Sequence, residues 1–134
     1  MKYKDFKLEV LPEKYSVCLI SKDYFSTKLL DQFEQLQEFL FGLIQTKIGY
    51  TWVGPTNLKP NTERYEDGWL ALRIIGEIPF DVYGILSSIL EPMAKQEISV
   101  FVLSDFKTDY ILFKEEYLGK VRNIFKKEDI CELS

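Results

Sequence analysis

The sequence predicts an α+β fold made of two tandem units, each of which reads as a strand, a helix and a strand hairpin. Residues 69–75 are rich in β-branched and bulky apolar side chains, which is typical of a strand. In residues 82–94 the apolar side chains recur with the i, i+3, i+4, i+7 spacing of an amphipathic helix. Residues 98–103 are almost continuously apolar, as in a buried strand, and residues 109–113 follow as a hairpin partner. With one more helix and strand, this order corresponds to the ferredoxin-like βαββαβ unit, with antiparallel sheets and helices on one face.

The helix in the second unit has a capping signal at its start and a proline near its end. Asp81 precedes the apolar stripe, and its carboxylate could accept hydrogen bonds from the first-turn N–H groups as an N-cap. Pro92 removes one backbone hydrogen bond, so we expect a kink or a shortening near residues 88–91. We expect the last helix over residues 114–127 and an edge strand over residues 128–133.

The N-terminal part repeats this order less regularly. Its predicted elements are strands at residues 6–10 and 15–20, a helix at 26–38, and hairpin strands at 40–46 and 49–53. Residues 54–68 contain prolines, glycines and a polar run, which favours a linker. We therefore predict a first subdomain over residues 1–60 and a second over residues 61–134. Each alone would have a thin core, so we expect the two to pair, with edges left over for a homodimer.

Composition narrows the possible functions. The net charge of −4 is mildly acidic and the charges are mixed along the chain, which argues against a nucleic-acid partner. The chain has no histidine, and its two cysteines fit no zinc spacing, so we predict no metal site and no cofactor. Cys18 lies in an apolar strand and is expected to be a buried free thiol. Because there is neither a signal-peptide pattern nor a membrane-length apolar run, we expect a cytoplasmic protein without a membrane association.

No set of side chains predicts catalysis. Neighbouring carboxylates, such as Glu115 with Glu116, are adjacent in sequence and point in different directions on a helix. Neither a P-loop nor a G-x-G-x-x-G motif is present. We therefore predict that the protein is not an enzyme.

One stretch carries a resemblance to a known family. The segment IIGEIPFDVYGILSSILEPMAKQEISVFVLSDFKTDYILFKEEYL resembles the second half of small ACT-domain proteins, in its F-D-V-Y-G-I-L-S-S-I-L, P-M-A, I-S-V-F and T-D-Y-I-L-F elements. It is similar to the ACT repeats of the cytosolic arginine sensor family of animals and to the regulatory domain of aspartate kinase. About a third of the chain matches closely, and LPEKYSVCLI and GYTWVGP match more loosely.

The resemblance implies a regulatory protein that binds an amino acid or a similar zwitterion between two ACT-like units. It implies ligand contacts at Phe80, Asp81, Val82, Tyr83, Gly84 and Ile85, and at Ser104, Asp105, Phe106 and Thr108. The chemistry is complementary, since helix N–H groups can hold a carboxylate and an acidic, carbonyl-rich turn can hold an ammonium group. Where relatives have an acidic or amide residue this chain has Lys107, which could occupy the ammonium position or reject a basic ligand.

The same residues also have plain structural interpretations. Asp81 could serve only as an N-cap, Gly84 could only permit close packing, and residues 105–108 could be an ordinary hairpin turn. The alternative function is a protein-interaction module without a ligand, which would dock a partner through an exposed sheet edge or helix face. A small enzyme on the same scaffold is the weakest hypothesis.

Overall fold

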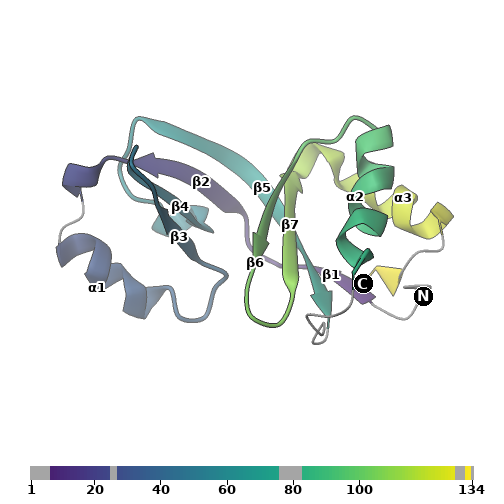
Figure 1. Cartoon of the computed structure of the whole chain (residues 1–134), viewed down its shortest axis with the longest axis horizontal. Helices are drawn as coiled ribbons and strands as arrows, with labels where there is room; N and C mark the ends of the chain where they lie inside the picture. Colours follow the sequence, from purple (N-terminus) through teal and green to yellow (C-terminus); the bar gives the residue numbers. More distant parts are fainter. Residues whose placement is uncertain (1–6, 25–26, 76–82, 129–131, 134) are drawn as a thin grey trace. The chain divides into compact units, whose positions relative to one another are not determined.

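The computed structural model describes residues 7–24, 27–75, 83–128 and 132–133 (Figure 1). The chain forms two compact units, one from Glu13 to Trp69 and one from Met1–Pro12 together with Leu70–Ser134. We call the first the inserted unit and the second the terminal unit, because the inserted unit interrupts the sequence of the other. This division differs from the expected one at residues 1–60 and 61–134, since the N-terminal strand belongs with the C-terminal half.

The terminal unit is built on five strands in the order β8–β1–β5–β7–β6. Their bounds are β1 Lys7–Val10, β5 Arg64–Ile75 (from Leu70 onward in this unit), β6 Val100–Ser104, β7 Asp109–Lys114 and β8 Glu132–Leu133. Strand β1 runs antiparallel to β5, with Leu8 opposite Ile74, and β8 is parallel to β1. β6 and β7 form the predicted antiparallel hairpin, with Val102 opposite Ile111. These pairings give the α+β fold that the sequence predicts.

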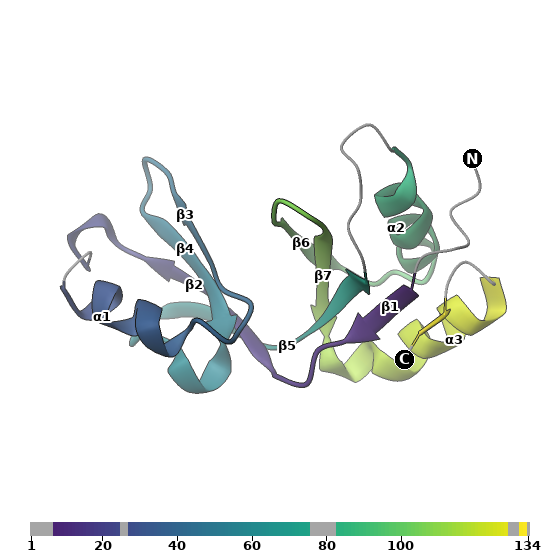
Figure 2. The ribbon, with the colours of Figure 1, turned by 90° about the horizontal axis from the view of Figure 1, so that it is seen from below.

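Helices α2 (Ile85–Lys95) and α3 (Leu118–Glu128, after the short 3-10 helix η3, Glu115–Tyr117) belong to the terminal unit (Figure 2). Alternate residues of the strands point to the same face of a sheet. The core contains such alternating residues of β5 and β7, residues of both helices, Leu8 of β1, and Ile98 between α2 and β6. Its buried members are Leu8, Leu70, Leu72, Ile74, Ile89, Met93, Ile98, Ile111, Phe113, Val121, Ile124 and Phe125. Both helices therefore cover the same face of this sheet.

Helix α2 begins and ends differently from the prediction. Its N-cap is Gly84, which has a left-handed backbone with φ 88° and ψ −9°. Asp81, the predicted N-cap, lies outside the described residues. Pro92 does not end the helix, which continues to Lys95, and its ring is buried. Burial of the apolar face thus outweighs the loss of one backbone hydrogen bond.

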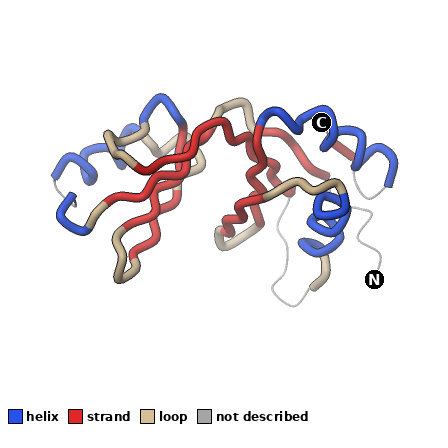
Figure 3. The backbone as a smooth tube through the Cα atoms, turned by 90° about the horizontal axis from the view of Figure 1, so that it is seen from above, coloured by secondary structure: helices blue, strands red, loops and turns tan. Residues whose placement is uncertain are grey.

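The inserted unit pairs its strands in the order β3–β4–β2–β5. Figure 3 shows the strands of the chain in red and its helices in blue. Its elements are β2 Tyr15–Ile20, the 3-10 helix η1 Lys22–Tyr24, α1 Thr27–Gln35, β3 Gly42–Gln45, β4 Tyr50–Pro55, the 3-10 helix η2 Thr56–Leu58 and β5 up to Trp69. Its core contains Cys18, Ile20, Leu36 and Trp52, which are all at most 2% exposed. Phe41 connects this core to α1, because its ring centroid lies 5.8 Å from that of Trp52 and 5.5 Å from that of Phe33.

The predicted linker over residues 54–68 is wrong at both ends. Strand β4 extends to Pro55, and β5 begins at Arg64. The first part of β5 is polar, so its composition is typical of a loop although its backbone pairs with β2. The pairing shifts register between Tyr15 and Val17, opposite Gly68 with φ 80°, which indicates a β-bulge at this point.

Candidate functional site

The turn between β6 and β7 is organised by the carboxylate of Asp105. Its Oδ1 accepts hydrogen bonds from the backbone N–H groups of Lys107 and Thr108, both at 2.8 Å. Its Oδ2 accepts a hydrogen bond from the hydroxyl of Tyr110 at 3.0 Å. The backbone N–H of Asp105 donates to the carbonyl of Thr108 at 3.0 Å and closes the turn. Asp105 is therefore first of all the residue that shapes this hairpin.

The same contacts keep Asp105 ionised. Partial burial raises the pKa of its carboxyl, but the hydrogen bonds from Thr108, Lys107 and Tyr110 together outweigh it and lower the pKa below the ordinary value of 3.8. Burial, and then the hydrogen bond to the Asp105 carboxylate, raise the pKa of the Tyr110 hydroxyl. The turn thus carries a fixed negative charge at neutral pH.

Two hydroxyl groups of the hairpin are also used by the fold. The Ser104 hydroxyl donates to the carboxylate of Asp109, its partner across the hairpin. Thr108 is 8% exposed, and its hydroxyl donates to the carbonyl of Ile74 at 3.0 Å. Ile74 lies at the end of β5, from which the chain leads to α2. The Thr108 hydrogen bond therefore ties the hairpin turn to the strand that leads toward the other predicted site segment.

The start of α2 presents backbone groups and one exposed ring. Gly84 has no side chain that could accept hydrogen bonds from the first-turn N–H groups. The N-cap residue therefore makes no side-chain capping hydrogen bond. The Gly84 carbonyl accepts from the hydroxyl of Ser87 and from the N–H of Ser88, both at 3.0 Å. Tyr83 is 83% exposed, and Phe106 in the hairpin turn is 75% exposed. Each predicted segment thus carries a large aromatic side chain in contact with solvent.

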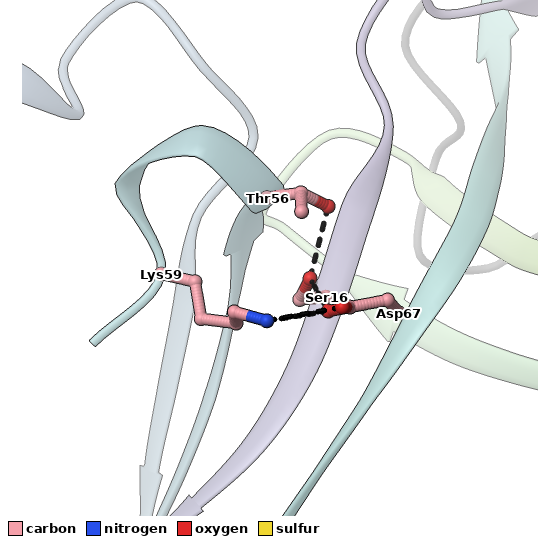
Figure 4. A network of polar contacts seen from close by, with 4 residues as sticks. All are labelled: Ser16, Thr56, Lys59 and Asp67. Carbon is pink, nitrogen blue, oxygen red and sulfur yellow. Dashed lines mark hydrogen bonds and ion pairs between the residues drawn. The ribbon is translucent and has the colours of Figure 1, made fainter. Parts of the chain in front are cut away.

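The inserted unit contains a polar cluster that the sequence did not reveal (Figure 4). We call Ser16, Thr56, Lys59 and Asp67 the Asp67 cluster. The Ser16 side chain is completely buried, and its hydroxyl lies 2.9 Å from that of Thr56 and donates to Asp67 Oδ1 at 2.5 Å. Lys59 Nζ lies 3.1 and 3.0 Å from the two carboxylate oxygens of Asp67.

The chemistry around the Asp67 cluster is that of a satisfied ion pair. The hydrogen bond to Asp67 raises the pKa of Lys59, and its ammonium also lies 3.7 Å from the centroid of the Tyr65 ring, a cation–π contact. Nearby, burial raises the pKa of the Cys18 thiol to about 11, so this buried free cysteine is a poor nucleophile. No local pattern signals the cluster, because Ser16 and Asp67 lie 51 positions apart.

The family comparison covers most of the terminal unit. Residues 64–127 match the family model described as ACT domain. This segment resembles an ACT domain. The resemblance to ACT-domain proteins that the sequence predicted is thereby confirmed. The match includes β5, α2, β6, β7 and α3 up to residue 127, and it leaves out β1 and β8, which complete the sheet.

Relatives and solved structures extend the similarity over nearly the whole chain. The human protein named CASTOR3P is 29% identical, over 91% of this chain and 81% of that protein. The crystal structure of the protein Atu0741 from Agrobacterium tumefaciens has a TM-score of 0.81 at 22% identity, covering 96% of this chain and 92% of that one. The regulatory subunit of aspartate kinase from Thermus thermophilus has a TM-score of 0.62 at 7% identity, covering 90% and 95%. The chain shares the fold of these two solved structures.

The predicted ligand residues all lie within the segment that matches the ACT-domain model, and the structure describes seven of the ten. Phe80, Asp81 and Val82 lie outside the described residues. Tyr83, Gly84 and Ile85 form the start of α2, whereas Ser104, Asp105, Phe106 and Thr108 form the hairpin turn and its flanks. Within the part of the chain that the structure describes, no group of His, Cys, Asp and Glu side chains could hold a metal ion, and no helix is long and apolar enough to cross a membrane.

Proposed function

We propose that the protein is a non-enzymatic regulatory protein that binds an amino acid or a similar zwitterion at its ACT domain. The observation that carries this proposal is the ACT domain itself, over residues 64–127, with a glycine-capped helix start and a charged hairpin turn. In this proposal, the first turn of α2 binds the ligand carboxylate and the hairpin turn binds the ligand ammonium group.

The first turn of α2 suits a carboxylate for two reasons. Its N–H groups carry the partial positive charge of the helix, and they point toward whatever lies before the helix. Gly84, with φ 88°, has no side chain that would keep a ligand away from this backbone. Tyr83 and Ile85 flank it and are proposed as side-chain contacts, together with Phe80, Asp81 and Val82.

The hairpin turn suits an ammonium group. Asp105 supplies an ionised carboxylate whose position is fixed by three hydrogen bonds from its own turn. A fixed charge binds a ligand without the entropy cost of ordering a mobile side chain. Phe106 is proposed to cover the ligand, and Ser104 and Thr108 to hold the turn in shape.

A regulatory role needs two states that the ligand binds unequally. We propose a homodimer in which the ligand lies between ACT-like modules of two copies, so that its binding changes how they pack. The inserted unit, with its β2–α1–β3–β4 order of strand, helix and hairpin, is proposed as a second, degenerate ACT-like module. The cytoplasm is the proposed compartment, in keeping with a free buried thiol at Cys18.

A second candidate function is a protein-interaction module without a ligand. Two observations favour it: the carboxylate of Asp105 already accepts three hydrogen bonds within the hairpin, and Tyr83 and Phe106 are 83% and 75% exposed. Exposed aromatic side chains are typical anchors of protein–protein interfaces.

A thermal-shift titration with each of the common amino acids distinguishes the two. A ligand that binds only the folded state stabilises it by about 2.7 kcal/mol at a hundredfold excess over its Kd, which raises the melting temperature clearly. If every amino acid leaves the melting curve unchanged, the ligand-binding proposal is wrong and the interaction module takes its place.

The glycine at the helix start offers a matched pair of variants. Gly84→Ala and Gly68→Ala each introduce a Cβ at similar left-handed angles, φ 88° and φ 80°, and each should cost roughly 1–2 kcal/mol. Only Gly84→Ala places its methyl group at the proposed carboxylate position. We expect it to weaken the ligand-induced shift, while Gly68→Ala keeps the full shift from a lower starting temperature. An equal loss in both variants would contradict this location.

A further inference from the structure

The Asp67 cluster lies where the chain enters and leaves the inserted unit. The chain passes between the two units twice, after Pro12 and after Trp69. Ser16 follows the first crossing on β2, and Asp67 precedes the second on β5. Tyr15 and Trp69 are paired across the sheet, so the two crossing strands are neighbours within the inserted unit.

Helix η2 is fastened to both of these strands. The N–H of Thr56 donates to the carbonyl of Lys14 at 2.9 Å, and its hydroxyl lies 2.9 Å from that of Ser16. Lys59, directly after η2, forms the ion pair with Asp67 at 3.0 Å. The start of β2 is thus joined to two segments far from it in sequence, η2 with Lys59 and the bulge of β5.

The contacts at the bulge depend on charge. Ser16 is completely buried, so its hydroxyl needs a partner, and the Asp67 carboxylate supplies one at 2.5 Å. The side chains of Lys59 and Asp67 remain 23% and 42% exposed, which leaves their ion pair accessible to screening by salt. A β-bulge interrupts the regular ladder of hydrogen bonds between the pairs Tyr15–Trp69 and Val17–Glu66, and the side-chain contacts of the Asp67 cluster add to the backbone pairing there.

We propose that the Asp67 cluster is a charge-dependent latch. With the ion pair formed, the latch holds η2 and the bulge of β5 against β2. When the ion pair is lost, this end of the inserted unit opens locally while the terminal unit stays folded. Strand β5, which carries the bulge, continues to Ile75 in the terminal unit.

Amide hydrogen exchange of the full-length protein tests the latch. Asp67→Asn removes the charge but keeps an oxygen that can accept from Ser16, and Lys59→Met removes the cation by a second route. Glu91→Gln is the matched control, because it breaks the ion pair with Lys95, in which both side chains are more than 70% exposed. Each protein is measured at low salt and at about 1 M salt, where the Debye length is about 3 Å.

We expect both latch variants to exchange roughly fivefold to thirtyfold faster over residues 56–59 and 64–68, and at the wild-type rate over residues 109–114. High salt should accelerate exchange of the first two segments in the wild type and add nothing in Asp67→Asn. The control should match the wild type everywhere. The latch is overturned if the two latch variants exchange at the wild-type rate. It is also overturned if high salt accelerates exchange in these variants as much as in the wild type, or if the variants lose as much protection over residues 109–114 as over residues 56–59 and 64–68.

Discussion

Leu8 tests whether the segment that resembles an ACT domain needs a strand that lies far outside the matched residues. This side chain is completely buried in the core of the terminal unit, opposite Ile74 of β5, although the family match begins only at residue 64. Leu8→Ala should therefore destabilise the core of the terminal unit, although Leu8 lies outside the residues that match the family model.

The size of the effect follows from what the substitution removes. It deletes roughly three methylene equivalents of about 0.8 kcal/mol each, or ~2.4 kcal/mol of transfer free energy. The cavity that remains adds to this, and such substitutions in cores cost about 2–5 kcal/mol. Strand β1 has the short strand β8 on its outer side, which can relax toward the cavity, so we expect about 3 kcal/mol and a Tm lower by about 10 °C.

Urea unfolding followed by far-UV circular dichroism measures this loss, and amide exchange of residues 109–114 assigns it to the terminal unit. Ile48→Ala is the control, because it removes a similar amount of side chain from a position that is 79% exposed. It should change the free energy of unfolding by at most about 0.5 kcal/mol. If Leu8→Ala proves as mild as Ile48→Ala, then β1 is not part of this core and the assignment of residues 1–12 to the terminal unit is wrong.

Three further predictions concern single side chains. With the other cysteine replaced by serine, Cys18 should react slowly with iodoacetamide at pH 8 until urea unfolds the protein, because its pKa is raised to about 11. The free energy of unfolding should fall as the pH rises from the ordinary thiol pKa of 9.0 toward about 11, because the Cys18 thiol loses its proton in the unfolded state before it does so in the folded state. Cys18→Ala should not show this pH-dependent fall. Asp105→Ala should cost about 1 kcal/mol of unfolding free energy, and this difference should be present above the ordinary carboxyl pKa of 3.8 and vanish at lower pH, because the folded-state pKa is lowered; persistence in acid would contradict it. In α3, Gly119→Ala has no atom within 4 Å of the new methyl group and should stabilise by about 0.5–1 kcal/mol, whereas Gly49→Ala would press against the carbonyl of Ile20 and should destabilise; equal urea midpoints would refute this.

Local patterns predicted the regular elements well where burial follows a simple period. Strand β2 has the predicted bounds, Tyr15–Ile20, and β7 starts at the predicted Asp109. These strands combine β-forming residues with clear turn residues at their ends. The start of α2 was not predicted, because an N-cap is selected by the path of the chain into the helix as well as by the residue type.

Contacts between residues far apart in the chain were not predicted from the sequence, and they share one reason. Residues 64–68 look like a linker by composition, since their side chains are polar, but their backbone is paired with β2. Ser16 and Asp67 lie 51 positions apart, and only the pairing of β2 with β5 brings them together. Of the candidate ligand residues, the structure assigns the hydroxyl of Thr108 to Ile74 and the carboxylate of Asp105 to its own turn, which residue types alone did not reveal.

The amino-acid sequence by itself determined the α+β class, the order of strand, helix and hairpin in each half, the buried thiol and the resemblance to ACT-domain proteins, because each depends on residues close together in the chain. Tertiary structure alone decided that residues 13–69 are inserted into the other unit, that Leu8 completes the ACT domain's core, and that Lys59 meets Asp67. Strand pairing between distant segments is chosen by burial and backbone hydrogen bonding of the whole sheet, and no short stretch of sequence records that choice.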